Sequence, residues 1–112
     1  MTGTLVVVRG AGDLATGCIL RLVRSGFSVA ALEAPEPSAI RRTVCLSEAM
    51  YEGNAQVEGL RALRVQSLEE LRAALDAFGP EGPVPILADT EASTVPHLRP
   101  LALVDAILAK RN

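Results

Sequence analysis

A short glycine-containing segment, Gly10–Ala15, is the part of the sequence best suited to hold a phosphate group. Gly10 would permit a tight exit from a preceding strand, and Gly12 would let the backbone approach a pyrophosphate without an intervening Cβ. Ala15 stands where such a motif needs a small residue for close packing of helix on strand. Backbone N–H groups at the helix start would then bind the phosphate. Gly10, Ala11 and Gly12 are therefore candidate ligand-binding residues, and the alternative is a purely structural turn.

Two polar side chains accompany this turn. Asp13 falls in the first turn of the expected helix, where a carboxylate stabilises the helix dipole but would repel a phosphate that it faced. Thr16 lies one turn further, where its hydroxyl could reach a phosphate or pack internally. Both are candidates for ligand contact, and a structural role remains the alternative for each.

Glu33 follows Gly12 by 21 residues and is expected at the end of the second strand. A carboxylate at that place can accept hydrogen bonds from both hydroxyls of an adenosine ribose and would repel a 2′-phosphate. The sequence therefore favours NAD, or another ligand with an unphosphorylated ribose, over NADP. The alternative is a solvated acid at a strand end.

Two adjacent arginines, Arg41 and Arg42, follow the loop after Glu33. Planar guanidinium groups bind phosphates and carboxylates through paired hydrogen bonds, so this pair could hold the anionic part of a ligand. Ordinary surface charge is the alternative.

Further candidates are expected at the carboxyl edge of the sheet, where open α/β folds bind their ligands. Asp89 follows the third core strand and is the stronger candidate, while Asp105 has weaker grounds. His97 stands at no recognisable spacing from a Ser or Cys and is interpreted as a surface residue. The sequence shows no nucleophile elbow, no metal-binding cluster and no acid–base pair for hydride transfer, so no catalytic residue is assigned.

Hydrophobic patterning indicates the elements that must position these residues. Thr4–Arg9 is rich in β-branched residues, which is typical of a strand buried on both faces of a parallel sheet. Apolar residues over 14–23 recur at helical spacing, and Gly26 is expected to end that helix in a left-handed conformation. Phe27–Leu32 predicts the second strand. Strand, glycine turn, helix and strand together have the size of a βαβ unit, about 30 residues.

The rest of the chain predicts a continuation of the same α/β pattern. Thr43 can cap a short helix that reaches about Tyr51, and Ser67 with Glu70 forms a capping box for a helix to Phe78. The tail, 101–109, could be helix or strand. A loop is expected over 33–38, and strands are expected over 56–58, 60–65 and 83–89.

Composition is that of one globular domain, 1–112, with 49% hydrophobic residues and a net charge of −2. With three aromatic residues and no positive excess, the chain lacks the stacking platforms and basic grooves of nucleic-acid binders. Its apolar stretches are too short to cross a membrane, and its two cysteines indicate neither a disulfide framework nor a zinc site. We therefore expect a cytoplasmic protein that binds neither nucleic acid nor membranes.

Several segments taken together resemble the selenium-dependent molybdenum hydroxylase accessory (maturation) proteins, relatives of the accessory factors of xanthine dehydrogenase-type enzymes. The resemblance implies a Rossmann-like fold, an open parallel sheet with flanking helices, and a place in molybdenum cofactor handling. Members of that family are usually more than twice as long, so this chain is expected to be an incomplete, N-terminal unit. The segments are Val8–Gly17, Glu33–Pro37, Ile40–Val44, Glu48–Gly53, Pro85–Asp89 and Leu103–Asn112.

Three hypotheses for function follow. The first is a nucleotide- or cofactor-binding domain of a molybdenum hydroxylase maturation factor, with NAD or a molybdopterin dinucleotide as ligand and a molybdenum hydroxylase as partner. The second is an NAD-binding domain of an oxidoreductase that lacks its substrate half. The third is a non-catalytic interaction module. A half-domain would expose apolar surface, so a homo-oligomer, at least a dimer, is expected.

Overall fold

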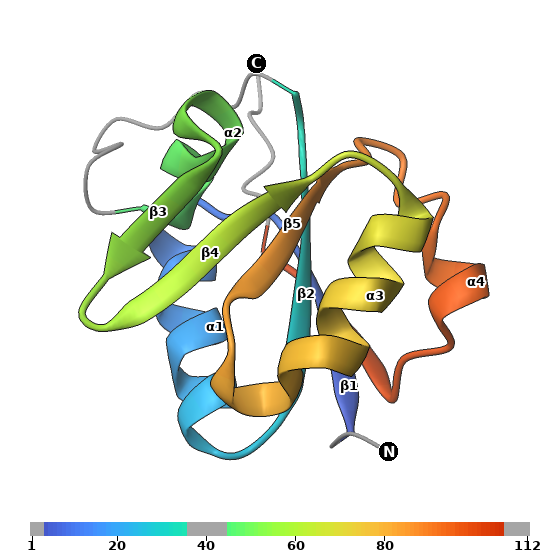
Figure 1. Cartoon of the computed structure of the whole chain (residues 1–112), viewed down its shortest axis with the longest axis horizontal. Coiled ribbons are helices and arrows are strands. Elements are labelled where there is room, and N and C mark those ends of the chain that lie inside the picture. Colours follow the sequence, from blue (N-terminus) through green and yellow to red (C-terminus); the bar gives the residue numbers. More distant parts are fainter. Residues whose placement is uncertain (1–3, 36–44, 107–112) are drawn as a thin grey trace.

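The computed structural model describes residues 4–35 and 45–106 of the chain. Within them the backbone forms a six-stranded, mostly parallel sheet with helices on both faces (Figure 1). The strand order across the sheet is β3-β4-β5-β2-β1-β6. In chain order the strands are β1 (Leu5–Arg9), β2 (Ser28–Glu33), β3 (Asn54–Val57), β4 (Leu60–Val65), β5 (Val84–Ala88) and β6 (Ala102–Asp105).

Two longer helices cover opposite faces of this sheet. Helix α1 packs on the face that also contacts α2, and helix α3 packs on the face that also contacts α4. Strand β1 is apolar on both faces because helices cover both faces of the sheet. Val6 and Val8 point to the α1 side, and Val7 points to the α3 side. The helical segments are α1 (Asp13–Arg24), η2 (Leu46–Glu48), α2 (Ala49–Glu52), α3 (Leu68–Phe78), η3 (Gly79–Glu81) and α4 (Val95–Leu98).

The topology has a switch point beside β1. The chain leaves β1 through α1 to reach β2 on one side, and it later returns to place β6 parallel to β1 on the other side. In open α/β sheets, ligands bind in the crevice at the carboxyl ends of the strands at such a point. The Rossmann-like α/β prediction is confirmed, and the glycine turn after β1 lies at this carboxyl edge.

The hairpin of β3 and β4 is the antiparallel part of the sheet. Its two-residue turn, Glu58-Gly59, has positive φ angles of 51° and 83°, as a type I′ turn requires. Strand β3 begins at Asn54 rather than at Gln56, so the prediction placed this strand two residues late.

The predicted helix ends can also be checked. Ser67 caps α3 by accepting a hydrogen bond from the Glu70 N–H at 3.1 Å, as expected. The Glu70 carboxylate, however, accepts a hydrogen bond from the N–H of Gln66 and not from that of Ser67. The tail, which the sequence left open between helix and strand, forms β6 as far as Asp105. Thr43, the expected cap of the helix before Gly53, lies outside the described residues.

The short helix α4 was not expected, because Pro96 interrupts an otherwise polar stretch. Among the described residues, the helices are all too short or too polar to cross a membrane.

Candidate functional site

The glycine turn is fixed to its neighbours through backbone hydrogen bonds. Gly10 has a φ of 110°, which favours glycine, and its N–H donates to the carbonyl of Leu32 at 2.6 Å. The N–H of Ala11 donates to Oε2 of Glu33 at 2.8 Å, and its carbonyl accepts from the N–H of Ser47, also at 2.8 Å. Because Ala11 is fully buried and both its backbone groups are bonded internally, it anchors the turn between β2 and η2.

Gly12 differs from Gly10 because neither its conformation nor its packing requires glycine. Its φ of −77° and ψ of −161° form an extended conformation that any residue adopts. A Cβ built on Gly12 would meet no atom within 4 Å in the described part of the protein. Gly12 is also the N-cap of α1, and among the described residues no side-chain hydrogen bond caps that helix. The Cβ position of Gly12 is therefore clear of described atoms at the start of α1.

Thr16 is buried, with 4% of its surface exposed, and its hydroxyl is used inside the protein. The hydroxyl donates to the carbonyl of Ala11 at 3.1 Å and accepts from the N–H of Leu46 at 2.9 Å. Thr16 thus joins the turn, α1 and η2, which is a positioning role. The sequence could not show this, because nothing in the pattern places residue 46 beside residue 16.

Glu33 lies at the end of β2 directly beside the glycine turn, as the ribose interpretation requires. Its two carboxylate oxygens accept hydrogen bonds from the N–H groups of Ala11 and Ala34, each at 2.8 Å. A carboxylate offers about four lone-pair positions, so two remain for other donors such as ribose hydroxyls. The side chain therefore stabilises the turn and keeps capacity for a ligand.

Asp89 follows β5, and its N–H donates to the carbonyl of Glu33 at 2.9 Å. Its carboxylate accepts four hydrogen bonds of 2.6–3.0 Å from the backbone and side chains of Ser93 and Thr94. Burial alone would raise the pKa of Asp89, but the bonds from Thr94 and Ser93 outweigh it and lower the pKa below 3.8. Asp89 is thus at the expected edge, where its carboxylate shapes the loop that leads to α4.

Arg9 is a residue at this edge that the sequence analysis did not single out. Its Nη1 contacts Oδ2 of Asp105 at 3.2 Å, which joins β1 to β6 at the switch point. Its Nη2 donates to the carbonyl of Thr90 at 2.9 Å. The buried Nε has no hydrogen-bond partner among the described residues. Its position could have been noticed in the sequence, because Arg9 is a charged residue at the end of a buried apolar strand.

The remaining predicted residues are Asp13, Arg41, Arg42 and His97. Arg41 and Arg42 lie outside the described residues, and so does the side chain of Asp13, which begins α1. His97 lies exposed in α4, and its carbonyl accepts a hydrogen bond from Arg72. In the described ranges, no group of three or more His, Cys, Asp and Glu side chains could hold a metal ion.

Comparison with known proteins gives a relative without an assigned activity. The chain is 43% identical over 109 residues to the Uncharacterized protein YqeB of Escherichia coli (strain K12). The match covers 96% of this chain but only 19% of the relative, so the chain spans about a fifth of that protein. No family model matches the chain, and no solved structure matches it.

Proposed function

We propose that this chain binds a nucleotide-type ligand, with a pyrophosphate and an unphosphorylated ribose, at the carboxyl edge of the sheet. The observation that carries the proposal is Gly12, a glycine that the fold itself does not require. Its Cβ position meets no described atom within 4 Å at the start of α1, where backbone N–H groups and the helix dipole favour an anion.

The proposed arrangement assigns one part of the ligand to each feature of the edge. The pyrophosphate lies over Gly12 and the first turn of α1, and the ribose hydroxyls donate to the remaining lone pairs of Glu33. The far end of the ligand extends toward the switch point, where Arg9 and Asp105 meet. Glu33 would repel a 2′-phosphate, so NADP should bind more weakly than NAD.

Molybdenum cofactor handling is the biological role that we propose for this binding, on the strength of the resemblance in the sequence. A molybdopterin dinucleotide carries the same pyrophosphate and ribose as NAD, so Gly12 and Glu33 fit the shared part of both ligands. In this role the chain holds and orients a cofactor and delivers it to a molybdenum hydroxylase. It works as a homo-oligomer in the cytoplasm. We propose no catalytic residue for it.

A calorimetric binding panel tests the proposal. The panel contains NAD, NADP, CTP, ATP and molybdopterin cytosine dinucleotide, and at least one should bind with a Kd of about 1 mM or lower. Gly12→Val should abolish this binding and leave the fold intact. The matched control is Gly17→Ala, because Gly17 lies further along α1 and its Cβ would also meet no described atom within 4 Å.

Two results would overturn the proposal. Failure of every ligand to bind the wild-type chain leaves the non-catalytic interaction module as the better description. Binding that survives in folded Gly12→Val protein removes the glycine turn from the site. Equal affinity for NAD and NADP would contradict the role of Glu33 in particular.

A further inference from the structure

A cavity of about 570 Å³ lies at the edge of the sheet opposite to the glycine turn. Its floor is formed where the parallel strands begin, by Thr4 and Leu5 at β1 and by Ser28 at β2. One wall is α3, and the other is the segment between α4 and β6. Figure 1 shows α3 and α4 side by side on this face of the sheet. The volume is within the usual range of small-molecule sites, about 300–1,000 Å³.

One side of the cavity is lined by apolar side chains, which solvent contacts when no ligand is bound. Leu75 of α3 and Leu98 of α4 are half-buried and line it together with Leu5. Leu101, at its rim, is 69% exposed, which is the largest exposure among the large hydrophobic side chains described. A bound apolar group would cover Leu101 and release the water around it.

Two arginines and one acid line the same cavity. Arg72 and Asp76 come from α3, and Arg99 follows α4. One nitrogen of Arg72 donates to the carbonyl of His97, which holds its guanidinium across the gap between α3 and α4. A guanidinium has five N–H donors, so Arg72 keeps further donors for a ligand. The three side chains together carry one positive charge, which a monoanion would balance.

Ser28 supplies an independent observation at the floor of the cavity. Only 2% of this residue is exposed, and its Oγ has no hydrogen-bond partner among the described residues. Buried hydroxyl groups nearly always have a partner, and an ordered water or a ligand atom can supply one where the described residues do not. Ser28 also borders the cavity, so its hydroxyl is a candidate partner for a group bound there.

We propose that this cavity binds a small amphipathic monocarboxylate. The carboxylate pairs with Arg72 and Arg99, and the apolar body lies against Leu75, Leu98 and Leu101. A polar atom of the ligand bonds to the Ser28 hydroxyl. This second site goes beyond nucleotide binding, because it lies at the amino ends of the strands whereas the glycine turn lies at the carboxyl ends.

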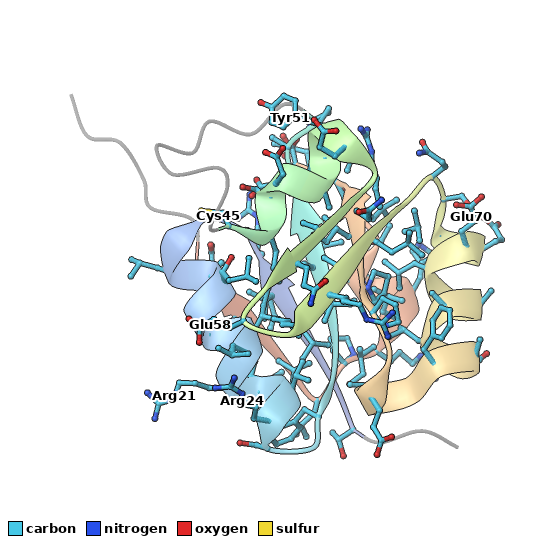
Figure 2. All side chains as sticks on the ribbon, turned by 60° about the vertical axis from the view of Figure 1, so that its left-hand side comes forward. Arg21, Arg24, Cys45, Tyr51, Glu58 and Glu70 are labelled. Atoms are coloured by element: carbon cyan, nitrogen blue, oxygen red, sulfur yellow. The ribbon has the colours of Figure 1, made fainter. Side chains whose placement is uncertain are left out.

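The experiment is a titration of the folded chain, followed by NMR chemical shifts, with 4-methylpentanoate as the probe. Binding should have a Kd of about 1 mM or lower and should shift the amide signals of Arg99 and Leu101. Arg72→Gln and Arg99→Gln should each weaken binding about tenfold, because each removes a charge-assisted hydrogen bond. The control is Arg21→Gln, since Arg21 points outward from α1 on the other face of the sheet (Figure 2).

Further arms of the titration identify the ligand class and separate the two sites. Butyl phosphate should bind more weakly than the carboxylate, and tighter binding of the phosphate would overturn the monocarboxylate assignment. Gly12→Val should bind the carboxylate as the wild type does, whatever the outcome of the nucleotide panel. The site proposal fails if the wild-type chain does not bind the probe, or if both arginine variants bind it with unchanged affinity.

Discussion

Replacing Gly12 with serine should separate the role of this position in folding from its role in binding. The extended φ and ψ of Gly12 suit an N-cap residue, and its Cβ position is open. A serine there can accept a hydrogen bond from an N–H of the first turn of α1, which no described side chain now caps. The substitution therefore adds a contact to the folded protein and removes none that the structure describes.

The expected gain in stability can be worked out from two contributions. Serine as an N-cap is better than glycine by a few tenths of a kcal/mol. Removing a glycine whose conformation other residues can adopt adds about 0.4–1 kcal/mol through the unfolded chain. We expect the free energy of unfolding to rise by about 0.5–1.5 kcal/mol in urea denaturation, and the melting temperature to rise by roughly 2–6 °C.

Ligand affinity should move in the opposite direction. The serine hydroxyl would occupy an N–H group that the phosphate needs, and loss of one charge-assisted hydrogen bond is worth about 1.5–3 kcal/mol. Calorimetry with the tightest ligand of the panel should therefore show binding weakened by about 10–100-fold.

The matched control is Gly17→Ala, an exposed position within α1. It should stabilise the protein by up to about 1 kcal/mol and leave the affinity unchanged. The reasoning is refuted if Gly12→Ser lowers stability, since the fold would then need glycine there. It is also refuted if the variant binds as tightly as the wild type.

Three further predictions concern other polar groups. Glu33→Gln should lower the free energy of unfolding by about 1–3 kcal/mol in urea denaturation, because an amide can accept only one of the two backbone N–H bonds through its oxygen; unchanged stability would contradict the anchoring role. The lowered pKa of Asp89 means that its stabilising contribution is complete above pH 3.8 and is lost as the pH falls through the folded-state pKa, so the stability difference between wild type and Asp89→Asn should shrink in acid. A difference that is constant across that range would show that the carboxylate bonds do not matter. Ser28→Ala should raise the stability of the ligand-free protein by about 1 kcal/mol, because it removes a buried hydroxyl without a partner, while weakening carboxylate binding; a less stable variant would show that the hydroxyl already has a partner.

Local patterns predicted the first half of the fold well. The apolar run of β1, the helical spacing of α1 and the cap at Gly26 each depend on residues close in sequence, and the structure confirms all three. The tail was different, because its short apolar run, Ala102–Val104, has no alternation of its own that would distinguish a strand from a helix. It becomes β6 through its pairing with β1, which no local pattern shows.

In the candidate site, too, the positions of residues could be predicted from the local sequence, whereas contacts with distant segments could not. Gly12 was identified from local spacing, and a Cβ at this position would meet no described atom within 4 Å. Thr16, Glu33 and Asp89 were placed at the correct edge of the sheet, yet their hydrogen bonds to Leu46, Ala11 and Thr94 could not be inferred from residue type. Residue type predicts where a polar group lies, whereas its partners depend on which segments the fold brings beside it.

Glu33 has two roles, a structural one in the glycine turn and a proposed one in ribose binding. Its bond to the Ala11 N–H holds the glycine turn against β2, so the same carboxylate that would bind ribose also sets the position of the phosphate-facing backbone. A ligand that drew Glu33 toward its ribose would therefore act on the turn as well. Ribose recognition and phosphate recognition should then be coupled, and Glu33→Gln should weaken binding of inorganic pyrophosphate even though that ligand has no ribose. Unchanged pyrophosphate affinity in this variant would show that the turn keeps its shape without the carboxylate.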